Sequence, residues 1–441
     1  MPKLGTGKGM CLALVGRVRV NEVSETVLPA PSAAPEVAIF DISAATGIAF
    51  IRSLGRAGVR MRLFTHERVS AGRFSRYQRG AVERCPSPER PDEFSPWLRE
   101  AVQRGRIEMI APTSDAIAFH ASEQRDVLPR AFSNVAPERE SILDCLFKDR
   151  FDAACRNAGF VAPPAVFPSS FEDAMSEGSQ LRFPVVIKPR LHLAVGSTRG
   201  TLAQTPRELR RKYRPYTVSA AGTRLLSRHP EIRLPIIQSV VGGARARPVS
   251  VSGLLSDNSE LVVGLGSIKR AQWPPGVGIG SEFGCWRDDE IQDQAIDLVK
   301  QVLGRGLFEL ELIFDEREPR RWYALDLNPR AHGFISLDCA RGADLPLLWY
   351  LTSLGRPLPE VHLREDLRWV HGLPHFIGRL SSIFAGPHRR AAASTLFAEI
   401  SRPPVDVVFD RTDPLASAVY VGRLLRHPGS LVRPGLRATP L

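Results

Sequence analysis

The chain has 441 residues, of which 43% are hydrophobic and 24% charged, a balance typical of a globular protein with two to four packed units. No apolar run reaches the roughly 18–20 residues of a membrane helix, so we expect no membrane partner. The net charge of +12 is spread along the chain, without a long basic run or a nucleic-acid-binding motif. We therefore expect a small anionic partner rather than nucleic acid.

The six cysteines are scattered along the chain and never form a C-x-x-C pair. This spacing argues against a structural zinc site and against a disulfide framework. We expect a reducing, cytoplasmic setting.

Residues 1–35 end in a stretch rich in proline, alanine and serine, which predicts a disordered arm or linker. Residues 36–140 then alternate strand and helix patterns, from the apolar strand Val37–Phe40 to the buried strand Ile107–Ala111. This alternation predicts an α/β unit with a parallel, doubly wound (Rossmann-like) sheet. Such a sheet binds its ligands beyond the carboxyl ends of its strands.

The remainder of the chain divides into three parts. Residues 141–235 contain a helix, a break at Pro163-Pro164 and the strand Phe183–Lys188. Residues 236–355 contain short strands separated by turn residues, a pattern typical of an antiparallel sheet, so the chain combines α/β and α+β units. Residues 356–441 form a mixed C-terminal extension to which the pattern assigns no role.

Lysine is rare in this chain, because only seven of its 59 basic residues are lysines. A lysine ammonium is a compact point charge and an arginine guanidinium is a planar fork, so the two are not interchangeable. The internal lysines are therefore candidates for positions that arginine cannot serve. Two of them, Lys212 and Lys300, fall on polar helix faces and are expected to be ordinary surface charges.

Two neighbouring strand patterns carry acids on one face. Along residues 308–312 the apolar residues alternate with two glutamates, and along residues 325–328 two leucines alternate with an aspartate and an asparagine. A hairpin that keeps the apolar faces together sets Glu311 opposite Asp326. Like charges opposed across a strand pair are destabilising, so this face needs a cation between its acids or full solvation. The same register sets Glu309 opposite Asn328, and it places Leu325 on the buried face with Leu327.

Two interpretations of the acidic face are open: a solvated sheet surface, where acids cost little, or a metal site. Carboxylate and amide oxygens are hard ligands suited to Mg²⁺, which typically completes its shell with phosphate oxygens and water. Pro329 ends the second strand and sets Arg330 at the rim of the sheet. An arginine there is well placed to grip a phosphate, which favours the metal site.

Residues 306–333 resemble the last core strands of the ATP-grasp ligases. That family combines a glycine, an acid five residues later and a Glu-x-Asn-Pro-Arg element. The resemblance implies that Glu311, Asp326 and Asn328 hold Mg²⁺ (or Mn²⁺), with Asp326 standing where the family has a glutamate. It also implies a catalytic role for Arg330, on the transferring phosphoryl group or on an acyl phosphate.

Other elements of the family occur in the same order. Phe183–Pro189 resembles the strand whose lysine contacts the ATP phosphates, which implies that role for Lys188. Lys148 resembles the earlier ATP-contacting lysine. Lys269 and Arg270 resemble the basic strand that faces the phosphates or the acyl phosphate, which implies catalytic roles for both.

Ile236–Gly242 resembles the hinge whose backbone holds the adenine ring. Ser239 stands where an acid is common in the family. The glycine-rich lid loop that usually follows the phosphate lysine is represented here only by Leu191–Gly200. The residues expected to contact the nucleotide at the hinge are Gln238, Ser239, Val240 and Val241.

The N-terminal unit resembles the pre-ATP domain of one branch, the predicted carboxylate–amine ligases similar to carbamoyl-phosphate synthase and D-aspartate ligase. Asp115 and Arg76 are candidate substrate contacts there, with surface salt bridging as the alternative. The segments that carry this match are Ile51–Val59, Phe74–Tyr77 and Ile110–Asp115. The domains implied are a pre-ATP domain at 36–140, a small (lid) subdomain at 141–235, a core subdomain with the metal-binding hairpin at 236–355 and the extension at 356–441.

The resemblance implies an ATP-dependent ligase that activates a carboxylate as an acyl phosphate for attack by an amine, releasing ADP and phosphate. The partners implied are a small-molecule carboxylate and a small-molecule amine, and a homodimer is a possible assembly. Three alternatives stay open: an ATP-grasp enzyme with another acceptor, of the bicarbonate or carbamoyl type; a non-catalytic ATP-binding module; and a nucleic-acid binder, which only the net charge supports. The pattern does not identify the acid, the amine or a general base.

Overall fold

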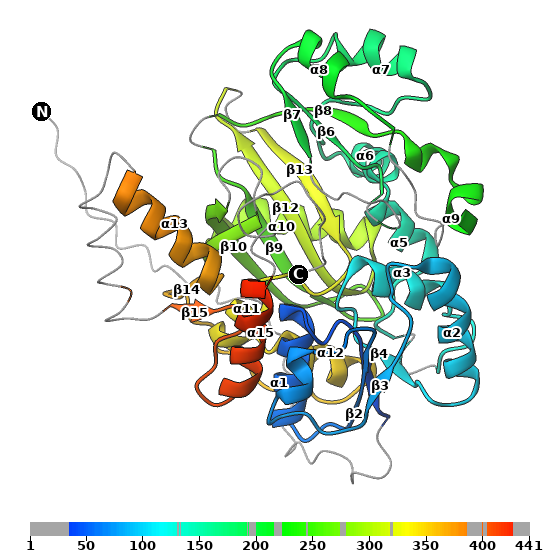
Figure 1. Ribbon diagram of the computed structural model, residues 1–441, viewed down its shortest axis with the longest axis vertical. Helices are drawn as coiled ribbons and strands as arrows, with labels where there is room; N and C mark the ends of the chain where they lie inside the picture. The colour runs from blue at the N-terminus through cyan, green and yellow to red at the C-terminus, as the bar shows by residue number, and fades with distance from the viewer. Residues whose placement is uncertain are drawn as a thin grey trace, which may run out of the picture.

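The computed structural model describes residues 35–426 apart from 130–131, 133, 192, 194–199, 216–222, 244–245, 274–278, 318–320, 386–398 and 400–403. The arm predicted at residues 1–35, apart from its last residue, and most of the lid loop at residues 191–200 lie outside the described residues. Figure 1 shows a small sheet at the top, long strands in the centre and the N-terminal unit at the bottom. No helix in the described part of the chain has the length and hydropathy of a membrane span.

The N-terminal unit is built around a four-stranded parallel sheet of order β3-β2-β1-β4. This confirms the predicted parallel α/β unit. The helix Asp115–Glu123 begins at a capping serine, because the Ser114 hydroxyl accepts a hydrogen bond from the Ile117 N–H at 3.3 Å. The elements are β1 (Val37–Ile39), α1 (Ala45–Arg56), β2 (Met61–Thr65), η1 (Ala71–Phe74), β3 (Val82–Arg84), α2 (Pro91–Gln103), β4 (Met109–Ile110) and α3 (Asp115–Glu123).

The small subdomain contains a four-stranded antiparallel sheet of order β5-β8-β6-β7. Strand β8, which falls in the unit predicted at residues 236–355, pairs here with β5 and β6 and so belongs to this small sheet. The elements are α5 (Arg139–Leu146), α6 (Lys148–Asn157), β5 (Ala165–Val166), α7 (Phe171–Gly178), β6 (Val185–Lys188), β7 (Thr201–Ala203), α8 (Pro206–Lys212), α9 (Thr223–Arg228), η3 (Pro230–Arg233) and β8 (Ile236–Ser239).

The largest sheet has seven strands in the order β13-β12-β9-β10-β11-β14-β15. Its first five strands are antiparallel neighbours, which confirms the pattern predicted from the turns. The C-terminal extension supplies β14 and β15 and so completes this sheet. The elements are β9 (Val249–Leu255), β10 (Leu261–Trp273), β11 (Ile279–Cys285), α10 (Asp289–Val302), β12 (Gly306–Asp315), β13 (Arg321–Asn328), α11 (Ile335–Arg341), α12 (Leu345–Ser353), β14 (Arg368–Val370), α13 (Gly372–Ala385), β15 (Val405–Asp406) and α15 (Pro414–Arg426).

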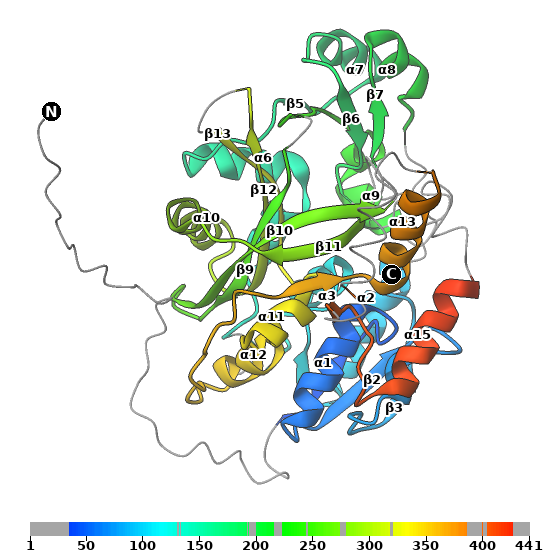
Figure 2. The ribbon, with the colours of Figure 1, turned by 90° about the vertical axis from the view of Figure 1, so that its left-hand side faces the viewer.

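One face of this sheet is apolar and packs against α10, which Figure 2 shows on one side of β9 and β10. Leu310 and Leu312 of β12 are fully buried there with Val251 of β9. Burial of each leucine contributes about 1.5–3 kcal/mol, and this fixes which way β12 faces. Because successive side chains of a strand alternate, the glutamates of β12 lie on the opposite face.

The predicted register of the hairpin is confirmed, since Glu309 pairs with Asn328 and Glu311 pairs with Asp326. Beyond Glu311 the pairing shifts by one residue, so that Leu312 faces Ala324. The predicted burial of Leu325 beside Leu327 is therefore wrong: a bulge at this point leaves Leu325 half-buried, and Ala324 takes the core position.

A shared hydrophobic core joins the N-terminal unit to the central sheet. Phe50 of α1 packs edge-on against Trp349 of α12, with ring centroids 5.7 Å apart. The same cluster includes Leu254 of β9 and Leu307 of β12. Because the two units bury apolar side chains in one core, they are held in a fixed relation to each other.

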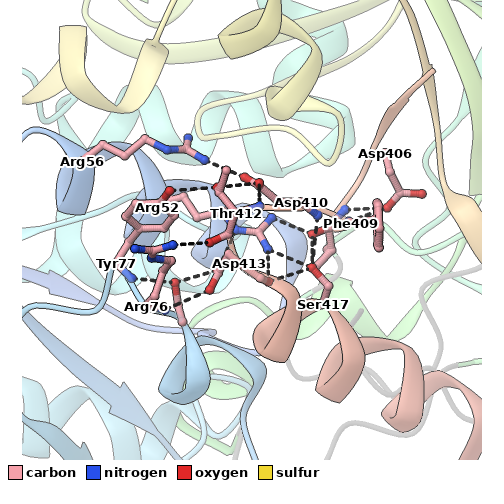
Figure 3. Close-up of polar contacts among 12 residues, drawn as sticks. Arg52, Arg56, Arg76, Tyr77, Asp406, Phe409, Asp410, Thr412, Asp413 and Ser417 are labelled. Carbon is pink, nitrogen blue, oxygen red and sulfur yellow. Dashed lines mark hydrogen bonds and ion pairs between the residues drawn. The ribbon is translucent and has the colours of Figure 1, made fainter. Parts of the chain in front are cut away.

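The C-terminal segment binds to the N-terminal unit through a buried ion pair, drawn in Figure 3. Arg52 Nε lies 2.9 Å from Asp413 Oδ2, with 9% and 1% of the two side chains exposed. Asp413 also accepts hydrogen bonds from the Ser75 hydroxyl at 2.7 Å and from the Arg76 backbone N–H at 2.9 Å. The guanidinium of Arg76 donates to the Thr412 carbonyl at 3.4 Å. These contacts place Arg76 in the interface with the C-terminal segment.

Candidate functional site

The two opposed acids of the hairpin lie on the polar face of the central sheet. Glu311 and Asp326 are neighbours across the strand pair, and each side chain is 23% exposed. Acids this enclosed do not fit the interpretation of a solvated sheet surface, because burying two like charges together costs free energy unless a cation relieves them.

Two lysines from different elements supply positive charge to this acid pair. Lys148, the first residue of α6, places Nζ 2.5 Å from Asp326 Oδ1. Lys269 of β10 forms an ion pair with Glu311. Burial opposes the charge of Lys269, but the carboxylate of Glu311 outweighs it and raises the pKa of Lys269 above its ordinary value. The two lysines expected to face the phosphates thus contact the two acids expected to hold the metal.

A third lysine, Lys188 at the end of β6, shares this environment. Burial, reinforced by the neighbouring charge of Lys148, lowers the pKa of Lys188 to about 8, although Asp326 and Glu311 act in the opposite sense. An ammonium group whose charge is disfavoured in this way gains free energy when an anion comes close. Lys188 is therefore suited to a phosphate ligand.

Glu309 is held by the protein itself. Its carboxylate accepts a hydrogen bond from the Ser250 hydroxyl at 2.8 Å and another from the Asn328 side-chain amide at 3.0 Å. The residue is buried, whereas Glu311 is half-buried. Glu309 thus orients Asn328, and Glu311 is the more accessible of the two glutamates for a cation.

Arg330 follows the hairpin and reaches back to the N-terminal unit. Its Nε lies 2.7 Å from Asp115 Oδ1, and its Nη2 lies 3.4 Å from Asp115 Oδ2. Nη2 also donates to Asn328 Oδ1 at 3.1 Å. Burial opposes the charge of Arg330, but Asp115 outweighs it and raises the pKa of the guanidinium. Asp115 therefore contacts the predicted catalytic arginine.

A small cleft lies beside Lys148, Asp326 and Asn328. Asp115 of the N-terminal unit, Lys148 of the small subdomain and Asp326 of the core all line it. The remaining lining residues are Cys145, Leu146, Leu191, Leu193, Leu327 and Asn328. Three units of the chain therefore meet at one cleft beside the acid pair.

The donor set suits a magnesium ion that is shared with phosphates. Glu311 and Asp326 offer two carboxylates and Asn328 an amide oxygen, and Mg²⁺ is typically held by one or two carboxylates with phosphates and water. Within the described residues no group of three or more His, Cys, Asp or Glu side chains is placed to hold a metal alone. The two carboxylates and the amide oxygen fit an Mg²⁺ ion that is bound together with the phosphates of a nucleotide.

The predicted hinge follows β8. Ser239 is buried and its Oγ has no hydrogen-bond partner within the described part of the chain, while Val240 is 37% exposed. The N–H groups of Ser239 and Val240 donate to the carbonyls of Pro164 and Pro184 at 2.8 and 2.9 Å. Gln238 and Val241 are half-buried. Adenine binding by this backbone stays a prediction.

Arg270 lies apart from the acid pair. It falls at a bulge of β10 and is exposed, and a Cβ added to Gly284 of β11 would lie 2.5 Å from its Nε. Its carbonyl accepts a hydrogen bond from Arg247 at 2.5 Å. The structure brings Lys269 to the acids but does not bring Arg270 there.

The sequence interpretation missed two serines of β9. Ser250 pairs with Glu311 and Ser252 with Glu309, so both lie on the acidic face. Ser252 donates a hydrogen bond to the fully buried Asp338 at 2.8 Å, and Asp338 in turn contacts His332. The signal was present in the alternation of serine and valine along residues 249–252.

Comparison with known proteins gives distant sequence relatives. No model of a protein family matches the chain. The large chain of carbamoyl phosphate synthase from Thermotoga neapolitana is 24% identical over 239 residues, which cover 54% of this chain and 21% of that protein. The Thermotoga maritima protein is 25% identical over 224 residues. The chain therefore spans about a fifth of the length of the curated relatives that it matches.

Solved structures share the overall fold at low sequence identity. N5-carboxyaminoimidazole synthetase from Staphylococcus aureus in complex with ADP has a TM-score of 0.60 at 14% identity, covering 79% of this chain and 85% of that one. The biotin carboxylase domain of a Hydrogenobacter thermophilus 2-oxoglutarate carboxylase, with MgADP and bicarbonate, has a TM-score of 0.56 at 14% identity, covering 76% and 73%. L-amino acid ligase from Bacillus licheniformis has a TM-score of 0.50 at 15% identity, covering 74% and 75%.

Proposed function

Because the chain has the ATP-grasp fold, we propose that it binds Mg-ATP at the acidic face of the central sheet and activates a carboxylate for attack by an amine. This proposal rests mainly on two partly buried ion pairs that lie side by side, Lys148 with Asp326 and Lys269 with Glu311. When a metal–polyphosphate complex binds, the carboxylates can exchange their lysine partners for the metal ion, and the ammonium groups can exchange the carboxylates for phosphates.

The side chains have distinct roles in this proposal. Lys148 and Lys188 offset the negative charge of the triphosphate. Glu311 and Asp326, with the amide of Asn328, would hold Mg²⁺ (or Mn²⁺), which neutralises charge on the terminal phosphates when bound. The predicted contact of the hinge backbone at residues 238–241 with adenine completes the nucleotide site.

The chemistry requires two displacements. A carboxylate oxygen of the acid substrate attacks the terminal phosphorus of ATP, and ADP leaves. The amine nitrogen then attacks the acyl carbon, phosphate leaves, and the amine gives up a proton. Lys269 and Arg330 supply positive charge near the transferring group, and positioning with charge stabilisation provides most of the rate in such reactions.

The proposal is tested by mixing the purified chain with ATP, Mg²⁺ and pooled amino acids and measuring ADP release. A ligase releases ADP only when an acid and an amine are both present. ATP binding without turnover in every pool would instead identify a non-catalytic nucleotide-binding module.

A second candidate acid is bicarbonate. It is favoured by the relatives named carbamoyl phosphate synthase and by the structural neighbour solved with bicarbonate and MgADP. ADP release that depends on added bicarbonate in degassed buffer, without an amino acid, would support this candidate. Release that is unaffected by bicarbonate removal would reject it.

A further inference from the structure

The guanidinium of Arg330 is almost fully engaged by the protein. A guanidinium has five N–H bonds. In Arg330, Nε donates to Asp115, Nη2 contacts both Asp115 and Asn328, and Nη1 donates to the Ala331 carbonyl at 2.9 Å. One N–H of Nη1 therefore has no partner among the described residues. The fork is fixed in orientation, and its remaining donor is the one available to a bound anion.

Asp115 is mounted rigidly for this contact. It is the first residue of α3 and follows directly on the capping Ser114, whose hydroxyl donates to Asp41 Oδ2 at 2.7 Å. The same loop makes a backbone contact with the arginine segment, because the Ala331 N–H donates to the Pro112 carbonyl at 2.9 Å. The N-terminal unit thus holds the segment after β13 at two points, one on the backbone and one on the Arg330 side chain.

We propose that Asp115 is a positioning residue for Arg330, so that the N-terminal unit aims the arginine at the acyl phosphate. This inference rests on the proposed function. Asp115 lines the cleft together with Lys148 and Asp326, so its carboxylate is beside the nucleotide site. A planar guanidinium gripped through Nε and Nη2 cannot rotate about its long axis without losing both bonds. Displacement of a catalytic group by about 1 Å can cost about 100-fold in rate.

The alternative is an ion pair that only fastens two units together. Arg52 and Asp413 provide the matched control, since they also join the N-terminal unit to a distant part of the chain. That pair is more deeply buried, with side-chain exposures of 9% and 1%, against 19% and 23% for Arg330 and Asp115. A purely structural role for Asp115 predicts the same phenotype from Asp115→Asn as from Asp413→Asn.

The experiment compares Asp115→Asn, Asp115→Glu and Asp413→Asn with the unmodified chain. ADP release is measured with ATP, Mg²⁺ and pooled amino acids, and MgADP affinity and thermal stability are measured alongside. Asp115→Asn is expected to lower kcat about 10- to 100-fold with the KM for ATP and the MgADP affinity unchanged. Asp115→Glu is expected to recover part of kcat because it restores the charge. Asp413→Asn is expected to lower the melting temperature while kcat below that temperature is kept.

Two outcomes overturn the proposal: an unchanged kcat in Asp115→Asn, or a fall in kcat that Asp413→Asn matches. If the unmodified chain shows no turnover, the proposed function fails, and the positioning role is then tested by binding of acetyl phosphate in the presence of MgADP. Asp115→Asn is expected to weaken that binding about tenfold while Asp413→Asn leaves it unchanged. Equal binding of acetyl phosphate by all variants, or no binding by the unmodified chain, overturns the proposal. If Asp115→Asn does not fold, Asp115→Ala replaces it in the comparison, with the same fall in kcat expected.

Discussion

The contribution of the ion pair between Lys148 and Asp326 to stability can be tested without knowledge of the substrates. Lys148→Met removes the ammonium group that contacts Asp326, which faces Glu311 across the hairpin. Removal of one partner from a buried pair costs about 3–5 kcal/mol, whereas an exposed pair contributes about 0–1 kcal/mol. Because Lys148 is 8% exposed and Asp326 is 23% exposed, we expect a loss of about 2 kcal/mol in the free energy of unfolding.

The assay is urea unfolding of Lys148→Met, Asp326→Asn and the double variant in nucleotide-free buffer. The double variant is expected to lose less than the sum of the two single losses, with a coupling energy of about 1–2 kcal/mol. Lys300→Met is the control, since Lys300 pairs with Asp297 one turn earlier on α10 and the two side chains are 38% and 68% exposed. That change is expected to cost about 0.5 kcal/mol. A coupling energy below about 0.3 kcal/mol between Lys148 and Asp326 would refute the electrostatic account of the acid pair.

Three further predictions concern other parts of the molecule. Burial and Lys148 lower the pKa of Lys188 to about 8, and a bound anion raises that pKa again. ADP binding is therefore expected to take up protons near pH 8 and to weaken as the pH rises further. Lys188→Arg is charged at every pH and is expected to flatten this pH profile in calorimetry. Asp413→Ala leaves Arg52 buried without this carboxylate and is expected to lower the free energy of unfolding in urea by about 3–5 kcal/mol. A loss below about 1 kcal/mol would contradict the contacts of Figure 3. Lys269→Met is expected to lower kcat for ADP release about 10- to 100-fold at nearly constant KM for ATP, and an unchanged kcat would remove Lys269 from the catalytic group.

The register of the acid hairpin could be predicted from the sequence because the side-chain period of a strand is two, and one apolar face fixes the other. The opposition of Glu311 to Asp326 followed from that alternation. The bulge at Leu325 could not be predicted in this way, since an extra residue in one strand leaves no mark on the local pattern.

The residues that contact these acids could not be predicted from the sequence pattern either. Lys148 and Asp326 are 178 residues apart, and only the packing of α6 beside β13 brings them together. The same holds for Asp115 and Arg330, which are 215 residues apart and come from different units. Hydrophobic periodicity indicates on which face of a helix or strand a side chain lies, but contacts between distant elements depend on how those elements pack.

The role of the acid pair in Mg-nucleotide binding is tested most directly by calorimetric titration of ADP, with and without Mg²⁺, into the unmodified chain and into Glu311→Ala and Asp326→Ala. We expect Mg²⁺ to tighten ADP binding in the unmodified chain and each variant to lose this gain. Variants that keep the full gain from Mg²⁺ would contradict the claim that the acid pair holds the metal and the nucleotide.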